Sequence, residues 1–175
     1  KHDLIVVSDE IYEKLTYGGV KHGSCASLPG VKERTITLNG VSKSYAMTGW
    51  RLGYAAAPVA CIKAMVRVHQ YINTCASSFV QEAGITALEK GESAVQEMVA
   101  EYQRRRDYAV DAINAIDGLS CNKPDGAFYI FVNVRSLGMS SAEVANYLLE
   151  EAHIATEPGS AFGPQGEGFS RIPYA

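Results

Sequence analysis

The stretch that decides the fold is TITLNGVSKSYAMTGWRLGYAA, residues 35–56. Its first four residues, Thr35-Ile36-Thr37-Leu38, are rich in β-branched side chains and predict a strand. Residues 51–56 predict a weaker strand, because their side chains are small, and Pro58 stops it. Between these two strands lies a polar loop that contains Lys43.

An apolar run comes earlier in the chain, at Leu4-Ile5-Val6-Val7, and polarity begins abruptly at Ser8-Asp9-Glu10. A short continuous apolar run is typical of a strand that is buried on both faces, as in a parallel sheet. The connection from this run to residues 35–38 exceeds the roughly twelve residues that a parallel crossover needs. The pattern therefore favours two parallel strands in an α/β fold.

Helical spacing replaces the strand pattern after residue 58. Apolar side chains recur at helical intervals over residues 59–69, and a second helix is predicted over residues 79–90, with Gly91 as its stop. A third and longer helix is predicted over residues 95–116, and Gly118 ends it.

The last third of the chain predicts a different unit. Residues 128–132 form a strong strand pattern, and Ser140 with Glu143 forms a capping box that opens a helix. Short strands are predicted at residues 153–156 and 169–172.

The predicted fold class is α/β: part of a mainly parallel sheet with flanking helices, followed by a small α+β unit. We expect residues 1–91 to belong to the first domain, residues 92–118 to form a long connecting helix, and residues 119–175 to form the second domain. The chain starts on a strand pattern and stops just after one, so we expect both ends to be cut from something longer.

Composition excludes several classes of protein. Of the 175 residues, 47% are hydrophobic and 20% charged, which is typical of a globular protein and not of a disordered one. The net charge of −3 argues against nucleic acid as a partner, and the basic run Arg104-Arg105-Arg106 is predicted to be a solvated helix face. No apolar run is long enough for a membrane helix, and no signal-peptide pattern opens the sequence. The four cysteines lack metal-ligand spacing, so we expect reduced thiols, no metal and a cytoplasmic protein.

Four polar residues are expected to meet at one edge of the sheet. Asp9 and Lys43 each come just after a predicted strand, and the carboxyl ends of parallel strands share one edge. Tyr12 follows Asp9 closely, and Arg51 follows Lys43. A carboxylate, a phenol, an amine and a guanidinium suggest a site for an anionic ligand with an electrophilic carbon. A turn cap at Asp9 and surface charges at the other positions are the alternative interpretation.

The order of these residues resembles that of a known family. Residues 40–53 resemble the pyridoxal-phosphate lysine signature of class I aminotransferases, of fold type I. Residues 8–12 resemble the family's cofactor aspartate–tyrosine segment, residues 169–175 its substrate-carboxylate arginine segment, and residues 124–129 and 158–163 also fit. The resemblance spans nearly the whole chain, is nearest to aspartate and aromatic aminotransferases, and corresponds to the C-terminal half of such enzymes.

The resemblance implies a role for each of these residues. Lys43 would bind the cofactor pyridoxal phosphate covalently and move the proton at the substrate Cα. Asp9 would pair with the protonated pyridine nitrogen, and Tyr12 would hydrogen-bond the phenolic oxygen of the cofactor.

Four further residues have implied roles. Arg51 would bind the cofactor phosphate, and Arg171 would bind the substrate α-carboxylate in a bidentate manner. Ser42 would touch the phosphate, although many relatives place a phosphate-binding serine at the position of Gly40. Phe162 would line the substrate pocket or anchor its own loop.

The implied function is transfer of an amino group between an amino acid and a 2-oxo acid, in a parent protein that is a homodimer without a membrane partner. Three alternatives stay open: a lyase or synthase of the same fold, a ligand-sensing domain of a transcription regulator, and a folded fragment that is inactive alone. We expect the 175-residue chain by itself to bind the cofactor weakly and to lack activity.

Overall fold

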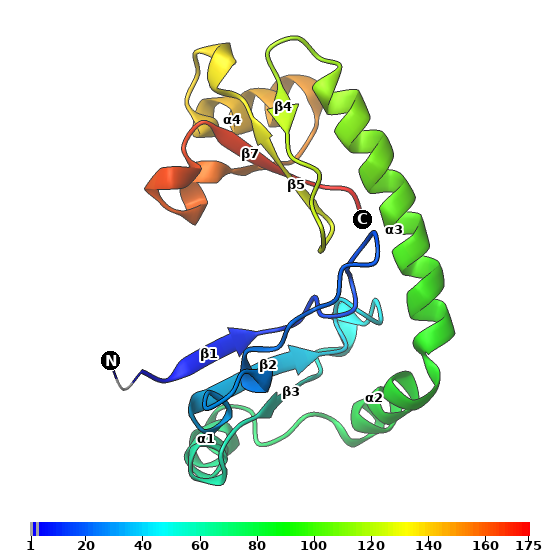
Figure 1. Ribbon diagram of the computed structural model, residues 1–175, viewed down its shortest axis with the longest axis vertical. Helices are drawn as coiled ribbons and strands as arrows, with labels where there is room; N and C mark the ends of the chain where they lie inside the picture. The colour runs from blue at the N-terminus through cyan, green and yellow to red at the C-terminus, as the bar shows by residue number, and fades with distance from the viewer. Residues whose placement is uncertain (1, 3) are drawn as a thin grey trace. The chain divides into compact units, whose positions relative to one another are not determined.

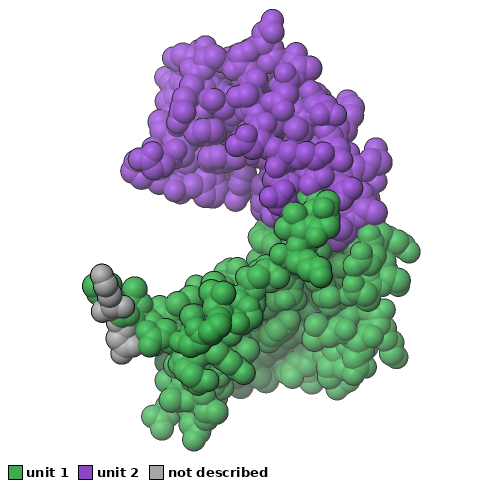
Figure 2. Space-filling view, viewed as in Figure 1, with its two compact units in different colours: residues 1–98 green, residues 99–175 purple. Residues whose placement is uncertain are grey.

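The computed structural model describes residue 2 and residues 4–175, which form two compact units (Figure 2). Unit 1 comprises residues 1–98 and unit 2 comprises residues 99–175. Each unit has a β-sheet of its own (Figure 1), and the two sheets share no strand among the described residues. The fold class is α/β, as the sequence predicts.

Unit 1 is built on a three-stranded sheet in the order β1-β2-β3. Strand β1 (Val6–Asp9) is parallel to β2 (Thr35–Gly40), and Asp9 pairs with Leu38 at the end of the register. Strand β3 (Gly53–Ala56) is antiparallel to β2, so the chain turns back on itself between the two. The parallel pair is confirmed, and the direction of β3 is a feature that the sequence pattern did not reveal.

The prediction that the first strand is buried on both faces is wrong. The strand begins at Val6 rather than Leu4, and the side chains of Leu4, Ile5 and Val7 are 65%, 62% and 63% exposed. Strand β1 lies at the edge of its sheet, so within the described residues it has a neighbouring strand on one side only. The exposed fractions show that the described residues do not cover the apolar side chains of this run.

Three helices follow the sheet of unit 1: α1 (Val59–Ile72), α2 (Ser78–Lys90) and α3 (Glu92–Asn114). They confirm the three predicted helices, with ends that differ by a few residues. Helix α2 stops at Gly91 as predicted, and a Cβ at this glycine would lie 3.0 Å from the ring of Tyr45. Gly91 therefore lets the junction of α2 and α3 pack closely against the loop after β2.

Buried apolar side chains anchor the chain just beyond the ends of β1 and β2. Leu15 and Tyr17, which come shortly after Asp9, are buried, and so is Val41, which precedes Lys43. Each such side chain stabilises the fold by about 1.5–3 kcal/mol relative to exposure. Core packing therefore fixes the backbone that carries Asp9 and Lys43.

Unit 2 holds an antiparallel sheet in the order β4-β5-β7-β6. Strands β5 (Tyr129–Asn133) and β7 (Phe169–Pro173) pair along their whole lengths. Strands β4 (Ser120–Cys121) and β6 (Glu157–Pro158) are short and lie at the two edges. The sequence predicts both long strands to within one residue at each end, but neither short one.

The predicted strand at residues 153–156 is wrong, and the end of the preceding helix explains why. Helix α4 (Ser141–Ala152) opens with the predicted capping box. It closes at His153, whose φ of 56° is left-handed, and the Ile154 N–H donates to the Leu148 carbonyl at 2.9 Å. The start of the segment therefore satisfies the Leu148 carbonyl at the helix end, and this use of its backbone replaces strand pairing.

The arginine run on α3 is solvated only in part. Arg104 and Arg105 are exposed and each lies 2.8 Å from the carboxylate of Glu101. Arg106, in contrast, is 4% exposed and donates to the Pro124 carbonyl at 3.0 Å. The prediction of a solvated face is confirmed for Arg104 and Arg105 and wrong for Arg106. The Arg106 side chain holds the segment at Pro124, which precedes β5, against α3.

The described residues contain no candidate membrane span, metal cluster or disulfide. The helices found there are too short or too polar to cross a membrane. No three His, Cys, Asp or Glu side chains gather there in a way that could hold a metal ion. Cys25, Cys61, Cys75 and Cys121 form no disulfide in this part of the chain.

Candidate active site

The ends of β1 and β2 place two of the predicted site residues at one edge of the first sheet. Asp9 is the last residue of β1, and Lys43 follows shortly after the end of β2. Because the strands are parallel, their carboxyl ends lie at the same edge. The Glu10 N–H donates to the Leu38 carbonyl at 2.8 Å, so the register continues one residue beyond the strand.

The amine of Lys43 lies beside Tyr12. Its Nζ is 6.0 Å from the centroid of the Tyr12 ring, and both side chains are half-buried. At this distance the face of the ring attracts an ammonium group. The turn from β1 to Tyr12 is stabilised by Asp9, whose Oδ1 accepts a hydrogen bond from the Ile11 N–H at 3.2 Å. The structure thus brings the Asp9–Tyr12 segment and Lys43 into one neighbourhood.

The loop around Lys43 is tightly wound. The Ala46 N–H donates to the Lys43 carbonyl at 3.2 Å, and the Val41 N–H donates to the Leu52 carbonyl at 3.3 Å. Ala46 and Arg51 have φ values of 53° and 54°, in the left-handed region that residues other than glycine adopt rarely. Such conformations cluster at ligand sites, where the surrounding packing holds them in place.

Arg51 and Ser42 lie at either end of this loop. Arg51 follows a 3-10 turn (Thr48–Trp50) and is exposed, and its Nη1 donates to the Thr48 carbonyl at 2.8 Å. The planar fork of a guanidinium has five donors and suits the geometry of a phosphate. Ser42 is half-buried and adds a hydroxyl directly before Lys43.

Gly40 ends β2 at a point where a side chain does not fit. A Cβ at this position would lie 2.8 Å from the Leu52 carbonyl oxygen and 3.0 Å from the Cα of Gly53. Both neighbours are backbone atoms of the paired chain and cannot rotate away. With this backbone a serine at position 40 would separate β2 from β3.

We expect the substitution Gly40→Ser to lower the free energy of unfolding by about 1–3 kcal/mol, the usual range for an overpacked site. Urea unfolding of the purified chain, followed by circular dichroism, measures this. The control is Gly49→Ser, because a Cβ at Gly49 would meet no atom within 4 Å. Equal effects of the two substitutions would contradict the steric argument.

Sequence reasoning missed Glu10, which is 5% exposed and accepts several hydrogen bonds. Its Oε1 accepts from Ser24 Oγ at 2.8 Å and from the Cys25 N–H at 3.3 Å, and its Oε2 lies 3.0 Å from His22 Nε2. The carboxylate therefore ties the following loop back to the end of β1, next to Asp9. A carboxylate directly after an apolar run, with histidine and serine in the next loop, is the sequence signal that could have identified it.

Hydrogen bonding keeps Glu10 ionised despite its burial. Burial by itself raises the pKa of this carboxyl group. Hydrogen bonds from His22, Ser24 and Ser8, together with the charge of His22, outweigh burial and hold the pKa below its ordinary value of 4.5. Glu10 is thus a buried anion whose partners all come from unit 1.

Arg171 belongs to unit 2, where aromatic rings flank it. Its Cζ lies 4.4 Å from the ring centroid of Tyr129 and 4.7 Å from that of Phe162. Its Nε is buried and has no hydrogen-bond partner among the described residues. A buried donor without a partner is unfavourable, so an incoming carboxylate would be stabilised there. Phe162 itself is 52% exposed, which excludes a buried anchor.

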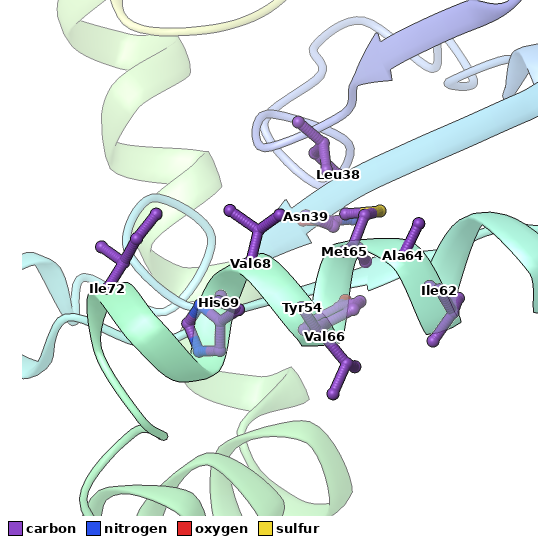
Figure 3. A pocket seen from close by; sticks show the side chains of 12 residues that line it. Leu38, Asn39, Tyr54, Ile62, Ala64, Met65, Val66, Val68, His69 and Ile72 are labelled. Atoms are coloured by element: carbon purple, nitrogen blue, oxygen red, sulfur yellow. The ribbon is translucent and has the colours of Figure 1, made fainter.

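A pocket of about 900 Å³ lies between β2, β3 and α1 (Figure 3). Its lining is mostly apolar, with Met65, Val68 and Ile72 from α1 and Tyr54 from β3. None of the predicted site residues lines it. The pocket is therefore separate from Asp9, Tyr12, Lys43 and the other predicted site residues.

Comparison with known proteins assigns the family. The sequence profile "Aminotransferase class I and II" matches residues 1–175. The chain belongs to the class I and II aminotransferase family. The chain is 51% identical over 177 residues to the aspartate aminotransferase of Pyrococcus abyssi, and the match covers 100% of the chain and 45% of that relative.

Solved structures agree with the assignment to class I and II. The aromatic aminotransferase of Pyrococcus horikoshii OT3 is 50% identical with a TM-score of 0.94, and the match covers 99% of this chain and 47% of that one. The PLP-bound structure of a protein from Clostridium difficile 630 is 26% identical with a TM-score of 0.93, and the match covers 99% and 46% of the two chains. The chain thus spans about 45% of the length of the relatives that it matches. The family resemblance read from residues 40–53 is confirmed.

Proposed function

We propose that this chain is the C-terminal part of an enzyme that moves an amino group between an amino acid and a 2-oxo acid by means of pyridoxal phosphate. The observation that carries this proposal is the Lys43 amine beside Tyr12, at the sheet edge where Asp9 ends β1. Membership of the aminotransferase family supports it.

The donor set of unit 1 fits this cofactor. An amine at Lys43 suits an aldehyde, and a carboxylate at Asp9 suits a protonated pyridine nitrogen. The guanidinium of Arg51 and the hydroxyl of Ser42 suit a phosphate. The left-handed backbone at Arg51 turns the chain directly after the loop that carries Lys43.

Pyridoxal phosphate, when bound, supplies an electron sink for the substrate carbanion. In this proposal Lys43 holds the group through its amine and later moves the proton at the substrate Cα. Asp9 keeps the ring nitrogen protonated, and Tyr12 donates a hydrogen bond to the phenolic oxygen. Arg171 binds and orients the substrate α-carboxylate.

The same proposal covers domains and assembly. Residues 1–91 would be the C-terminal part of the cofactor-binding domain, residues 92–118 the connecting helix, and residues 119–175 the small domain. The whole enzyme would be a cytoplasmic homodimer, and the cysteines without disulfides support that location.

The test is a graft in which residues 1–175 replace the matching segment of the Pyrococcus abyssi aspartate aminotransferase. We expect the graft to transaminate aspartate or an aromatic amino acid with 2-oxoglutarate. The substitution Arg171→Gln should raise KM for both substrates about tenfold or more, as loss of a hydrogen-bonded charge pair does. The exposed Arg105→Gln is the matched control.

Two results would contradict the proposal. A folded graft that binds the cofactor but transfers no amino group would contradict the activity. Consumption of more than one equivalent of the amino acid per bound cofactor, without any 2-oxo acid acceptor, would instead indicate a lyase. The 175-residue chain tested alone is expected to show no turnover.

A further inference from the structure

Arg171 faces a carboxylate of its own chain across the sheet. The register of β6 and β7 pairs Glu157 with Arg171, and that of β5 and β7, which lie side by side (Figure 1), pairs Phe131 with it on the other side. Directly paired residues on neighbouring strands share one face of a sheet. Arg171 Nη2 lies 3.9 Å from Glu157 Oε2, too far for a hydrogen bond but close enough for electrostatic attraction.

The aromatic rings hold the guanidinium at this intermediate distance. Phe162 and Tyr129 both contact the Arg171 guanidinium, as described above. Phe162 is itself packed edge-on against Phe131, at 5.9 Å between ring centroids. Ring contacts on the cation restrict how far it can swing toward Glu157. The donors of Arg171 therefore stay available to a ligand, while the negative charge of Glu157 stays near.

We propose that Glu157 is a specificity-determining residue, which lowers the affinity of Arg171 for carboxylates and disfavours substrates with an acidic side chain. This inference rests on the proposed function of Arg171 as the substrate-carboxylate site. Glu157 neutralises part of the guanidinium charge in the ligand-free protein and repels an incoming anion. Repulsion grows with ligand charge, so a dicarboxylate is penalised more than a monocarboxylate.

The size of the effect follows from exposure. The side chains of Arg171 and Glu157 are 33% and 49% exposed, so solvent screens their interaction. Pairs of this kind change an equilibrium by about two- to fivefold. Glu157 therefore adjusts selectivity between substrate classes and does not block either class.

The experiment titrates the 175-residue chain, labelled with ¹⁵N-arginine, with pyruvate and with 2-oxoglutarate. The readout is the NMR signal of the Arg171 Nε–H, which the variant Arg171→Gln identifies by its loss. We expect Glu157→Gln to lower the dissociation constant of pyruvate about two- to fivefold and that of 2-oxoglutarate by more. The matched control Glu151→Gln removes the same charge from an exposed position on α4 and should leave both constants unchanged.

A second variant tests the ring contacts. Phe162→Leu should let Arg171 approach Glu157 and weaken carboxylate binding, and the added change Glu157→Gln should remove that weakening. Equal constants in Glu157→Gln and the unchanged chain would overturn the role of Glu157 and leave Arg171 as a carboxylate site. If neither oxo acid shifts the Arg171 Nε–H signal in any variant, that result would overturn both this inference and the assignment of Arg171 as a carboxylate site.

Discussion

Replacing Lys43 by alanine in the graft should abolish transamination, with kcat lowered by about 10⁴-fold or more. Alanine has no amine, so it can neither hold the cofactor covalently nor move a proton at the substrate Cα, and losses of this size are usual for a residue with both roles. Steady-state kinetics with an amino acid and 2-oxoglutarate measure the loss. The visible absorbance that the Lys43 linkage gives the bound cofactor should vanish as well.

The control for this experiment is Lys63→Ala, which removes an exposed lysine on α1. It should leave kcat and the absorbance unchanged. Borohydride reduction of the unsubstituted graft should fix the pyridoxyl group on the peptide that contains Lys43. Peptide mapping that finds the group on another lysine would refute the assignment.

Replacing Glu10 by alanine should lower the free energy of unfolding of the chain by about 1–3 kcal/mol, the usual cost of leaving hydrogen-bond donors without their buried acceptor. The substitution leaves His22, Ser24 and the Cys25 N–H without the acceptor that they share. Urea unfolding at neutral pH measures the change. Glu33→Ala, at an exposed position, is the control and should stay within about 0.5 kcal/mol.

The contribution of Glu10 should depend on pH in a defined direction. Its pKa in the folded chain is below the ordinary value of 4.5, so the folded state binds this proton less readily than the unfolded state. The stabilisation is therefore fully present above pH 4.5 and is lost as the pH falls through the folded-state pKa. The stability difference between the unsubstituted chain and Glu10→Gln should shrink in that acid range. A difference that stays constant with pH would contradict the ionised state of Glu10.

Features that depend on neighbouring residues in the sequence were predictable. The capping box of α4 and the stop of α2 at Gly91 each need only residues within a few positions of one another. The long strands of unit 2 were predictable because their apolar runs are continuous and bounded by turn signals.

Features that depend on distant partners were not predictable. The burial of Arg106 requires the Pro124 carbonyl, which lies beyond the end of α3. The exposure of Val7 depends on which elements pack over the faces of β1, and an apolar run does not encode that. The prediction of a strand at residues 153–156 is wrong because the start of this segment is hydrogen-bonded to the C-terminal end of α4.

The residues of the candidate site likewise fall into those that a continuous motif identifies and those that depend on distant partners. Residues 40–53 identified Lys43 and its loop because the signature is continuous in sequence. Neither Glu10 nor Glu157 stood out, because each acts through residues that only folding brings near. The constraint on Gly40 likewise comes from the backbone of β3 and is invisible in the sequence of β2 alone.

The pairing of β1 with β2 has a consequence for how this part of the molecule can vary in evolution. Asp9 and Lys43 are positioned by two adjacent, paired strands. The length of the chain that joins those strands therefore does not set the distance between the two residues. Within that connection, Gly18 and Gly19 are exposed, and a Cβ at either would meet no atom within 4 Å. An exposed tip of this kind accommodates inserted residues. Insertions at this tip can therefore accumulate, and even acquire a recognition task of their own, while the two polar residues keep their spacing.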